Sequence, residues 1–447
     1  MSNVKDGVLK LLGAAVRLSS YIFNTMWIIG EKIISIGLAF VMAVLLARYL
    51  GPEDFGLLSY AASTIAIFAA AGHMGLNGLI VREIVRNEER EGEIVGTGLL
   101  LKFFGLLISY LILVSYALIF ESGSAIAQSL IIFGGLSLLF KTFDVLDFWF
   151  QSKIKYRYVS ISRTSSLVLS HGFRLFLLLN GMSLVFFGYA IAIQSLIAAS
   201  LLILFYKIIS GTGLSSLSFN KVRAVLLLKQ GWAVYLGAIF AVIYFKIDQV
   251  MLRWLVGAKE VGIYSVAAQL SEAWYFFPVA IVSSVFPKLI KIRERSDVEF
   301  DKRFQQLLDV LYLIALVVAI VITIFSHKIV SLFFGMEYID AANILTIHIW
   351  ASIFIFLRAA FSRWILIENM LIFSLLTQGA GALINIVLNM ILIPKFSGEG
   401  AALATLVSYA TASFISLLVS SRTRPVFFMM LKTLCFVSLH SSWKKIR

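Results

Sequence analysis

Long apolar stretches constrain this sequence more than any other feature. Twelve windows hold the roughly 20 mostly apolar residues that a helix needs to cross a bilayer, at 19–47, 56–81, 96–119, 125–150, 157–180, 184–206, 229–255, 261–287, 304–326, 340–361, 370–393 and 400–420. With 60% hydrophobic and 14% charged residues over 447 positions, the chain carries more apolar surface than a soluble core could bury. The sequence predicts an all-α polytopic membrane protein with about twelve transmembrane helices.

Lysine and arginine are distributed unequally among the connections between these windows. If the N-terminus is cytoplasmic, the inner connections and the tail carry 26 of them, and the outer connections carry only Arg48, Arg253, Lys259, Lys328 and Lys395. Because cytoplasmic loops are enriched in basic residues, we expect both termini to be cytoplasmic. The net charge of +14 then reflects topology and contacts with anionic membrane lipids, and it does not indicate a nucleic-acid partner.

One motif occurs twice. A shift of 206 positions aligns "LARYLGPEDFGLLSYAAS" (46–63) with "LRWLVGAKEVGIYSVAAQ" (252–269), so that Gly51 meets Gly257 and Gly56 meets Gly262. Each copy joins the first two windows of its half, which predicts a parallel repeat with its pseudo-twofold axis along the membrane normal. We therefore expect two pseudo-symmetric six-helix lobes around a central cavity. The predicted parts are an N-terminal lobe at 1–210, a cytoplasmic linker at 211–228, a C-terminal lobe at 229–421 and a basic, interfacial tail at 422–447.

The motif itself has a structural explanation. Pro52 cannot continue a helix, and Gly51 can adopt backbone angles that other residues avoid. Glu53 and Asp54 then fall in the first turn of the next helix, where the helix dipole favours acidic side chains. The motif predicts a tight outer connection followed by small residues that allow close helix packing.

Three segments resemble a known family. "LARYLGPEDFGLLSYA", "GLNGLIVREIVRN" and "LFFGMEYIDAANIL" are similar to sequences of the polysaccharide repeat-unit (O-antigen, Wzx-type) flippases of the multidrug/oligosaccharidyl-lipid/polysaccharide exporter superfamily. The resemblance implies a secondary transporter rather than an enzyme, working by alternating access in the inner membrane. Its implied cargo is a polyprenyl-pyrophosphate-linked oligosaccharide for O-antigen and lipopolysaccharide synthesis. A polysaccharide polymerase and chain-length proteins are implied partners.

Two other functions remain open from the sequence. A multidrug or cation antiporter of the same superfamily would share the fold, although the many cations in the windows suit a cationic drug poorly. A membrane polysaccharide polymerase would need a sizeable outer loop, and no connection exceeds about 25 residues by the window boundaries. The single cysteine, Cys435, excludes a disulfide framework and a cysteine-rich metal site. We expect no metal and no cofactor.

Polar residues within the windows are the candidate functional residues, because a charge at the bilayer centre costs about 2.5–3.5 kcal/mol on insertion scales. Candidates for lining a substrate cavity are Arg163, Arg174, Lys246, Arg358, Lys141, Gln378, Asn385 and Asn389. Arg163 and Arg174 share one helical stripe, and the arginine fork suits a pyrophosphate. Candidates for coupling to H⁺ or Na⁺ are Glu31, Asp144, Asp147, Asp248 and Glu272. The alternative is mutual neutralisation of Lys141 with Asp144 and of Lys246 with Asp248.

The charge of the expected cargo also indicates a driving force. An anion that leaves a cell whose interior is 100 mV negative moves with the membrane potential, which releases about 2.3 kcal/mol per charge. We therefore expect transport to use the membrane potential, H⁺ or Na⁺ antiport, or both, without ATP hydrolysis.

Overall fold

The structure is a computed structural model that describes residues 2–436, with side chains described for residues 23–436. Every regular element between these limits is a helix, which confirms the predicted all-α class. Nine stretches of the described chain are long and apolar enough to cross a membrane, from Phe23–Arg86 to Leu371–Leu418. The protein is a multi-pass membrane protein.

Two of the nine stretches are too long for a single crossing, and a backbone break divides each. Helix α1 (Ser2–Gly72) is interrupted at Gly51, with φ 73° and ψ 173°. Helix α15 (Leu371–Ser413) is interrupted at Ser397, with φ 47° and ψ −127°. Both breaks fall between predicted windows. A further long helix, α7 (Tyr156–Leu179), is less apolar because it carries Arg157, Arg163 and Arg174. The count of twelve crossings stays a prediction.

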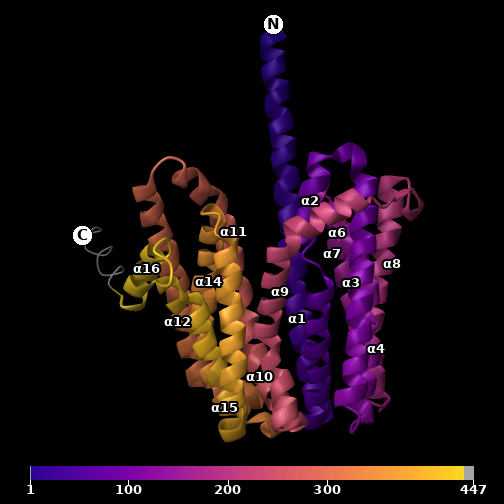
Figure 1. The fold of residues 1–447 in the computed structure, drawn as a ribbon, viewed down its shortest axis with the longest axis vertical. Helices are drawn as coiled ribbons and strands as arrows, with labels where there is room; N and C mark the ends of the chain where they lie inside the picture. Colours follow the sequence, from indigo (N-terminus) through magenta and orange to yellow (C-terminus); the bar gives the residue numbers. More distant parts are fainter. Residues whose placement is uncertain (1, 437–447) are drawn as a thin grey trace. The chain divides into compact units, whose positions relative to one another are not determined.

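The chain forms two compact units, which we describe separately. Unit 1 comprises Met1–Leu45 and Phe68–Tyr235. It contains both ends of α1 (up to Leu45 and from Phe68 onward), α2 (Asn77–Arg86), α3 (Glu91–Phe120), α4 (Ala125–Gly135), α5 (Ser137–Phe140), α6 (Val145–Ser152), α7, α8 (Val185–Ser210) and the start of α9 (Lys221–Leu255). Helix α8 packs against α4 and α7, and α3 lies beside α4 (Figure 1). Ile80, Val95, Leu146, Phe150 and Leu202 belong to its buried core.

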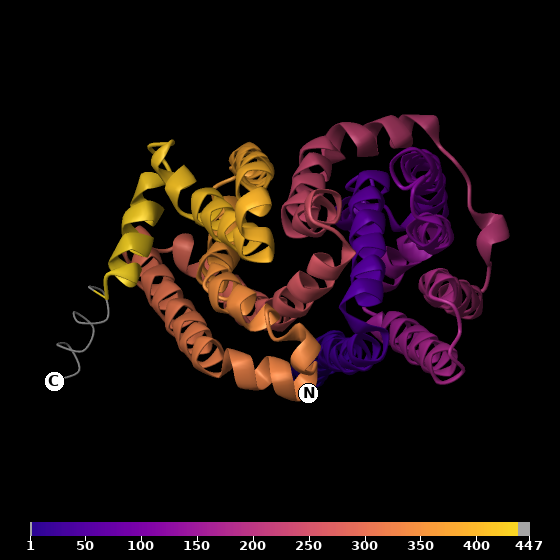
Figure 2. The same ribbon diagram turned by 90° about the horizontal axis from the view of Figure 1, so that it is seen from below.

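Unit 2 comprises Leu46–Ile67 and Leu236–Arg447. It contains the middle part of α1 and the rest of α9, followed by α10 (Ala258–Glu272), α11 (Phe276–Arg293), α12 (Asp297–Phe333), α13 (Ala341–His348), α14 (Ala351–Ile367), α15 and α16 (Arg424–Leu434). Its core is rich in aromatic side chains of α12 and α14, including Phe300, Phe304, Phe356 and Phe361. Several of these helices are seen nearly end-on in Figure 2.

Proline explains the interruption between α10 and α11. A short 3₁₀ turn, Ala273–Tyr275, separates the two helices, and Pro278 is the third residue of α11. Proline lacks the N–H that would bond to the carbonyl four residues earlier and clashes with that carbonyl. Helix α11 continues through its second proline, Pro287.

Two boundaries differ from the expected ones. The window 56–81 ends early, because α1 stops at Gly72 and α2 starts at Asn77. Gly75 turns the chain there with φ 64°, and a Cβ at this position would lie 2.8 Å from Tyr235 N. The predicted linker 211–228 includes the first turns of α9, which begins at Lys221.

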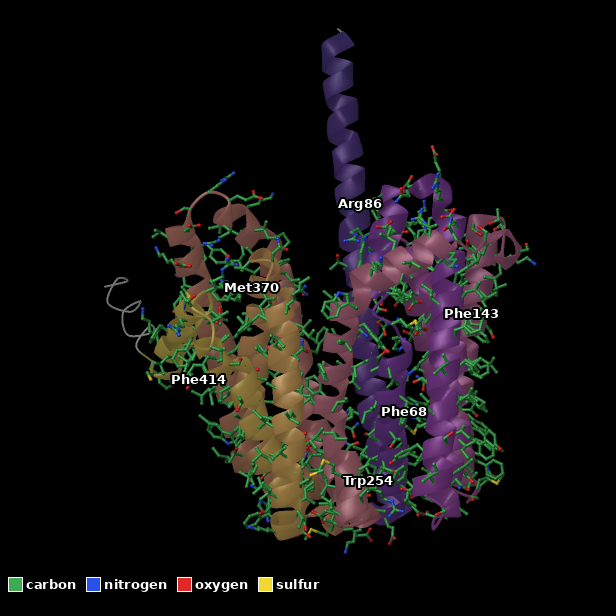
Figure 3. The ribbon with its side chains drawn as sticks, in the orientation of Figure 1. Phe68, Arg86, Phe143, Trp254, Met370 and Phe414 are labelled. Atoms are coloured by element: carbon green, nitrogen blue, oxygen red, sulfur yellow. The ribbon has the colours of Figure 1, made fainter. Side chains whose placement is uncertain are left out.

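Much of the apolar run in the predicted interfacial tail packs on the protein. It forms α16, in which Val426, Met430 and Thr433 are buried. The Gln305 Nε2 of α12 donates to Thr433 Oγ1 at 2.7 Å. Phe427 stacks on Phe414, with ring centroids 4.5 Å apart, where α16 meets the segment after α15 (Figure 3). Residues 437–447 of the predicted tail lie outside the described residues.

The two copies of the repeated motif contact each other within unit 2. A Cβ on Gly56 would lie 1.9 Å from the Ala258 carbonyl oxygen, and a Cβ on Gly262 would lie 2.0 Å from that of Pro52. Position 52 corresponds to 258 and position 56 to 262 under the 206-residue shift, so the contact is itself pseudo-twofold. The absent side chains let the second part of α1 and α10 pack backbone to backbone.

Candidate functional site

A polar pocket of about 350 Å³ lies in unit 1. Its walls come from α1, the 3₁₀ turn Lys141–Asp144, α7 and α8, and its lining residues are Glu31, Ser35, Ala39, Lys141, Asp144, Arg163, Ser166, Leu167, Gln194, Ser195 and Ala198. Residues three apart in a 3₁₀ helix lie on the same side, which lets one short turn present both Lys141 and Asp144. Four of the predicted ionisable residues therefore share one pocket.

Two ion pairs, each with one buried partner, support this wall. Arg163 donates to the carboxylate of Asp147, which is fully buried behind the pocket. Lys102 Nζ lies 3.6 Å from Asp144 Oδ2, and only 1% of Lys102 is exposed. The predicted neutralisation of Asp144 by Lys141 is therefore wrong, because the buried lysine of α3 occupies that role. Lys141 has no ion pair among the described residues.

Lys102 was not among the sequence candidates. The signal was present, because "LLLKFFGLL" places a lone lysine inside an apolar window and such a residue needs a partner within the membrane. Gln194 and Ser195 of α8 also line the pocket and were missed. Neutral polar residues are common in membrane helices, so their types alone give no such signal.

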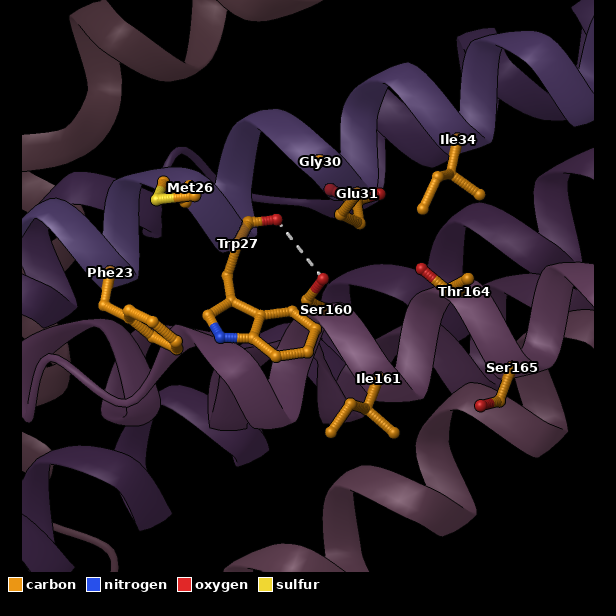
Figure 4. A pocket seen from close by; sticks show the side chains of 10 residues that line it. All are labelled: Phe23, Met26, Trp27, Gly30, Glu31, Ile34, Ser160, Ile161, Thr164 and Ser165. Atoms are coloured by element: carbon orange, nitrogen blue, oxygen red, sulfur yellow. Dashed lines mark hydrogen bonds between the residues drawn. The ribbon is translucent and has the colours of Figure 1, made fainter.

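A second, mostly apolar groove of about 360 Å³ adjoins the polar pocket. It lies between α1 and α7 and is lined by Phe23, Met26, Trp27, Gly30, Glu31, Ile34, Ser160, Ile161, Thr164 and Ser165 (Figure 4). Ser160 Oγ donates to the Trp27 carbonyl at 3.3 Å and ties the helices together. Glu31 lines both spaces, and its Oε1 accepts a 3.1 Å hydrogen bond from Ser35.

A different polar cluster is buried in unit 2 around Asp248, which is 2% exposed. Its carboxylate accepts hydrogen bonds from Tyr264 (2.8 Å), Thr405 (2.5 Å) and Asn389 (2.5 Å). Asn389 Nδ2 also lies 3.2 Å from Asn385 Oδ1. All of these donors are neutral. The Asp248 cluster, meaning these five residues, brings Asn385 and Asn389 to an ion-coupling candidate.

The other charged candidates of unit 2 have partners of their own. Lys246 Nζ lies 3.1 Å from Glu272 Oε2, so the predicted neutralisation of Asp248 by Lys246 is wrong. Arg358 donates to Thr377 Oγ1 at 3.1 Å and to the Ala412 carbonyl at 2.8 Å. These contacts join α14 to α15.

Gln378 and Arg174 take up separate positions. Gln378 Nε2 donates to Ser374, which also accepts from Arg358 at 3.3 Å. Arg174 is half-buried on α7 and lines neither the polar pocket nor the apolar groove. It shares the stripe of Arg163, but eleven residues place it about 16 Å further along the helix. Its role in a substrate cavity stays a prediction.

Hydrogen bonds within unit 2 fix the chain beside the predicted outer connection of the first motif. Arg48 Nε donates to the Phe333 carbonyl at 2.7 Å, at the C-terminal end of α12. The Tyr338 hydroxyl donates to the Ala47 carbonyl at 2.9 Å, and burial raises the pKa of Tyr338, which keeps this donor protonated. These contacts support a structural role for the connection.

The fold and the buried charges define a polytopic helical membrane protein with a charged pocket and a separate carboxylate cluster. The sequence profile of the family described as "Polysaccharide biosynthesis protein" matches residues 22–293, more than half of the chain. The chain belongs to this family.

Individual proteins are also similar to this chain. A Shigella flexneri protein named "Putative O-antigen transporter" is 26% identical over 351 residues, which cover 73% of this chain and 80% of that protein. The lipid II flippase MurJ in an inward closed conformation superposes with a TM-score of 0.70 at 15% identity, over 93% of this chain and 91% of that chain. An inward-facing multidrug resistance MATE family transporter of the MOP superfamily gives 0.63 at 15% identity, over 89% and 95%. At such identities these structures show a shared fold.

Proposed function

We propose that this protein is a flippase that moves a polyprenyl-pyrophosphate-linked oligosaccharide from the cytoplasmic to the outer leaflet of the inner membrane. The observation that carries the proposal is the polar pocket, where Arg163 and Lys141 lie between the helices of unit 1. Membership of a polysaccharide biosynthesis family and similarity to an O-antigen transporter support this cargo class. We expect a secondary transporter without enzymatic activity.

The pocket chemistry suits a pyrophosphate joined to sugars. Lys141 offers a cation that is not used in an ion pair among the described residues. Arg163 already contacts Asp147, and its planar fork has further donors for phosphate oxygens. Ser166, Gln194 and Ser195 offer neutral partners for sugar hydroxyls. The headgroup would occupy the pocket while access alternates between the two faces of the membrane.

The Asp248 cluster is the strongest of the candidate sites for ion coupling. Glu31 has Lys32, Glu272 has Lys246, Asp144 has Lys102 and Asp147 has Arg163, whereas the hydrogen bonds to Asp248 come from neutral groups. Intramembrane carboxylates serve as proton relays, and Na⁺ is held by oxygen atoms in transporters. We propose that Asp248 binds H⁺ or Na⁺ and that this gradient adds to the membrane potential.

Transport by the purified full chain tests the proposal. Proteoliposomes would carry a fluorescent prenyl-pyrophosphoryl disaccharide, and a membrane-impermeant quencher would report its leaflet. Wild-type protein should move the lipid without ATP when an inside-negative potential is applied. Lys141→Gln should lower the initial rate about tenfold or more, because a charge-assisted contact is lost. Lys155→Gln makes the same charge change at an exposed residue and should not change the rate.

A second variant separates function from folding. Arg163→Ala would leave Asp147 buried and unpaired, which is strongly destabilising. The double variant Arg163→Gln/Asp147→Asn removes both charges together and should fold while transporting poorly. Transport of a cationic dye in place of the lipid would identify a multidrug antiporter, and growth of glycan chains would identify a polymerase. Either result would overturn the flippase proposal.

A further inference from the structure

The apolar groove between α1 and α7 has no role in the mechanism described so far. Its walls expose large apolar side chains, with Phe23 64%, Met26 63% and Ile34 47% exposed. Its volume of about 360 Å³ is at the small end of the usual range for ligand sites. Gly30 lines the groove, and no atom lies within 4 Å of a Cβ placed on this glycine. The space beside Gly30 could therefore accept part of a hydrocarbon chain.

The groove and the polar pocket share one lining residue. Glu31 lines both spaces, so an apolar surface on α1 lies one residue away from a pocket that contains Lys141 and Arg163. A molecule that fits both must join an anionic group directly to hydrocarbon. A prenyl pyrophosphate has this structure, because its first isoprene unit is bonded to the phosphate oxygen. A glycerophospholipid instead places a glycerol and two polar ester groups between phosphate and hydrocarbon.

The position of the groove also fits loading from the cytoplasmic leaflet. Gly30 precedes the outer turn at Gly51 by 21 residues, which corresponds to about 30 Å of helix. Ser160 lies close to the start of α7 at Tyr156. In the predicted topology both residues lie toward the cytoplasmic end of their helices.

We infer that the groove between α1 and α7 binds the first isoprene units of the lipid-linked substrate while the polar pocket holds its pyrophosphate. This inference rests on the proposed function and assigns a lipid subsite within unit 1. The subsite contacts the hydrocarbon next to the phosphate, and it therefore favours a branched prenyl carrier over molecules that share only the headgroup. Binding of the prenyl segment and binding of the pyrophosphate should therefore be separable by mutation.

Gly30→Leu tests the subsite because its Cβ meets no atom within 4 Å, its larger side chain would take up space in the groove, and it keeps every charge of the pocket. Leucine also favours the helix more than glycine. The full chain in phosphatidylcholine nanodiscs would be titrated with dimethylallyl pyrophosphate and farnesyl pyrophosphate, with binding to empty nanodiscs subtracted. Wild-type protein should bind the farnesyl compound about tenfold more tightly, from added apolar contact. Gly30→Leu should reduce this preference to about twofold or less, because it should weaken the farnesyl compound, with three isoprene units, more than the dimethylallyl compound, with one.

A matched control lies on the same helix. Gly37 is seven residues further along, has no atom within 4 Å of a Cβ placed on it and is not part of the groove lining. Gly37→Leu should keep the wild-type preference.

The outcomes separate the subsite from the proposed function. A farnesyl preference that Gly30→Leu leaves intact would overturn the subsite, and so would a wild-type protein that binds both pyrophosphates equally. Competition by phosphatidylglycerol, with no effect of Gly30→Leu on farnesyl binding, would assign the groove to ordinary lipid. A wild-type protein that binds neither pyrophosphate would count against the proposed function itself.

Discussion

Asp248 shows how a single buried carboxylate can respond to an ion. Burying a charge is costly unless it is paired and hydrogen-bonded, and the three donors that Asp248 meets are all neutral. A bound proton or Na⁺ would remove the unbalanced charge. Because Asn385, Asn389 and Thr405 lie on α15 while Asp248 and Tyr264 lie on α9 and α10, ion binding would also change how these helices are held together.

We expect Asp248→Asn to abolish the dependence of transport on a Na⁺ or H⁺ gradient, because the amide cannot carry the negative charge. Affinity for a prenyl pyrophosphate should change by no more than about twofold, since distant sites usually contribute independently. Initial transport rates at varied Na⁺ and pH gradients would measure the first effect. A variant that keeps full ion dependence would contradict the role of Asp248.

Asp309 offers the matched control. It is also buried, at 5% exposed, and accepts hydrogen bonds from Gln305 at 3.0 Å and Thr433 at 2.6 Å. Asp309→Asn should lower thermal stability through its contacts with α16 and leave the ion dependence of transport intact.

The sequence identified many of the charged residues of the site but not their partners. Arg163, Lys141, Asp144 and Glu31 were all recognisable as charges within apolar windows, and the structure brings them to one pocket. Spacing along a helix suggested that Lys141 pairs with Asp144. The actual partner, Lys102, comes from α3, and the choice depends on how neighbouring helices are rotated, which spacing within one helix does not contain.

At the scale of helices, the contact between Gly56 and Gly262 is the tightest constraint described. Each missing Cβ would overlap a backbone carbonyl of the facing helix, and backbone atoms cannot rotate away as a side chain can. The two helices can therefore approach at this point only with glycine at both positions.

Gly56→Ala should destabilise the protein by about 1–3 kcal/mol or more, because an added methyl group must push two helices apart. Gly262→Ala should behave alike, and the double variant should cost less than the sum, since both changes break one contact. Thermal unfolding in detergent would measure these effects. Gly78→Ala is the control, because no atom lies near its Cβ position, and it should be neutral or stabilising. If Gly56→Ala, Gly262→Ala and the double variant were all as stable as the wild type, the contact would be contradicted.

Helix boundaries were predictable where proline and glycine mark them. The breaks at Gly51 and Ser397 fall in the expected connections, next to Pro52 in one case and Gly398 in the other. The second break also depends on tertiary structure, because Glu260 of α10 accepts a 2.8 Å hydrogen bond from Gly398 N. The early end of α1 is also marked by glycine, at Gly72 and Gly75, although the apolar window 56–81 runs through it. The 3₁₀ turn at Lys141–Asp144 carries no comparable local signal.

At the scale of the whole molecule, the predicted orientation follows from loop charges and can be measured directly. Cys435 is the single cysteine of the chain and is exposed. A membrane-impermeant maleimide should label it in inverted vesicles and not in intact spheroplasts, because the positive-inside rule places this end in the cytoplasm. The variant Cys435→Ser/Ser122→Cys moves the thiol to an exposed residue between α3 and α4 and should show the opposite pattern. Labelling of both cysteines from the same side would overturn the topology.

The pseudo-twofold glycine contact suggests a history for the repeat. Had each half once been a separate six-helix protein, the same contact in a symmetric dimer would have been isologous, with one surface meeting its own copy. Every substitution would then have altered both sides at once. Fusion into one polypeptide releases that restriction, so one copy could evolve the cationic pocket of Arg163 while the other kept a carboxylate at Asp248. A duplicated gene can evolve such a difference between its two halves, whereas the two identical subunits of a homodimer cannot.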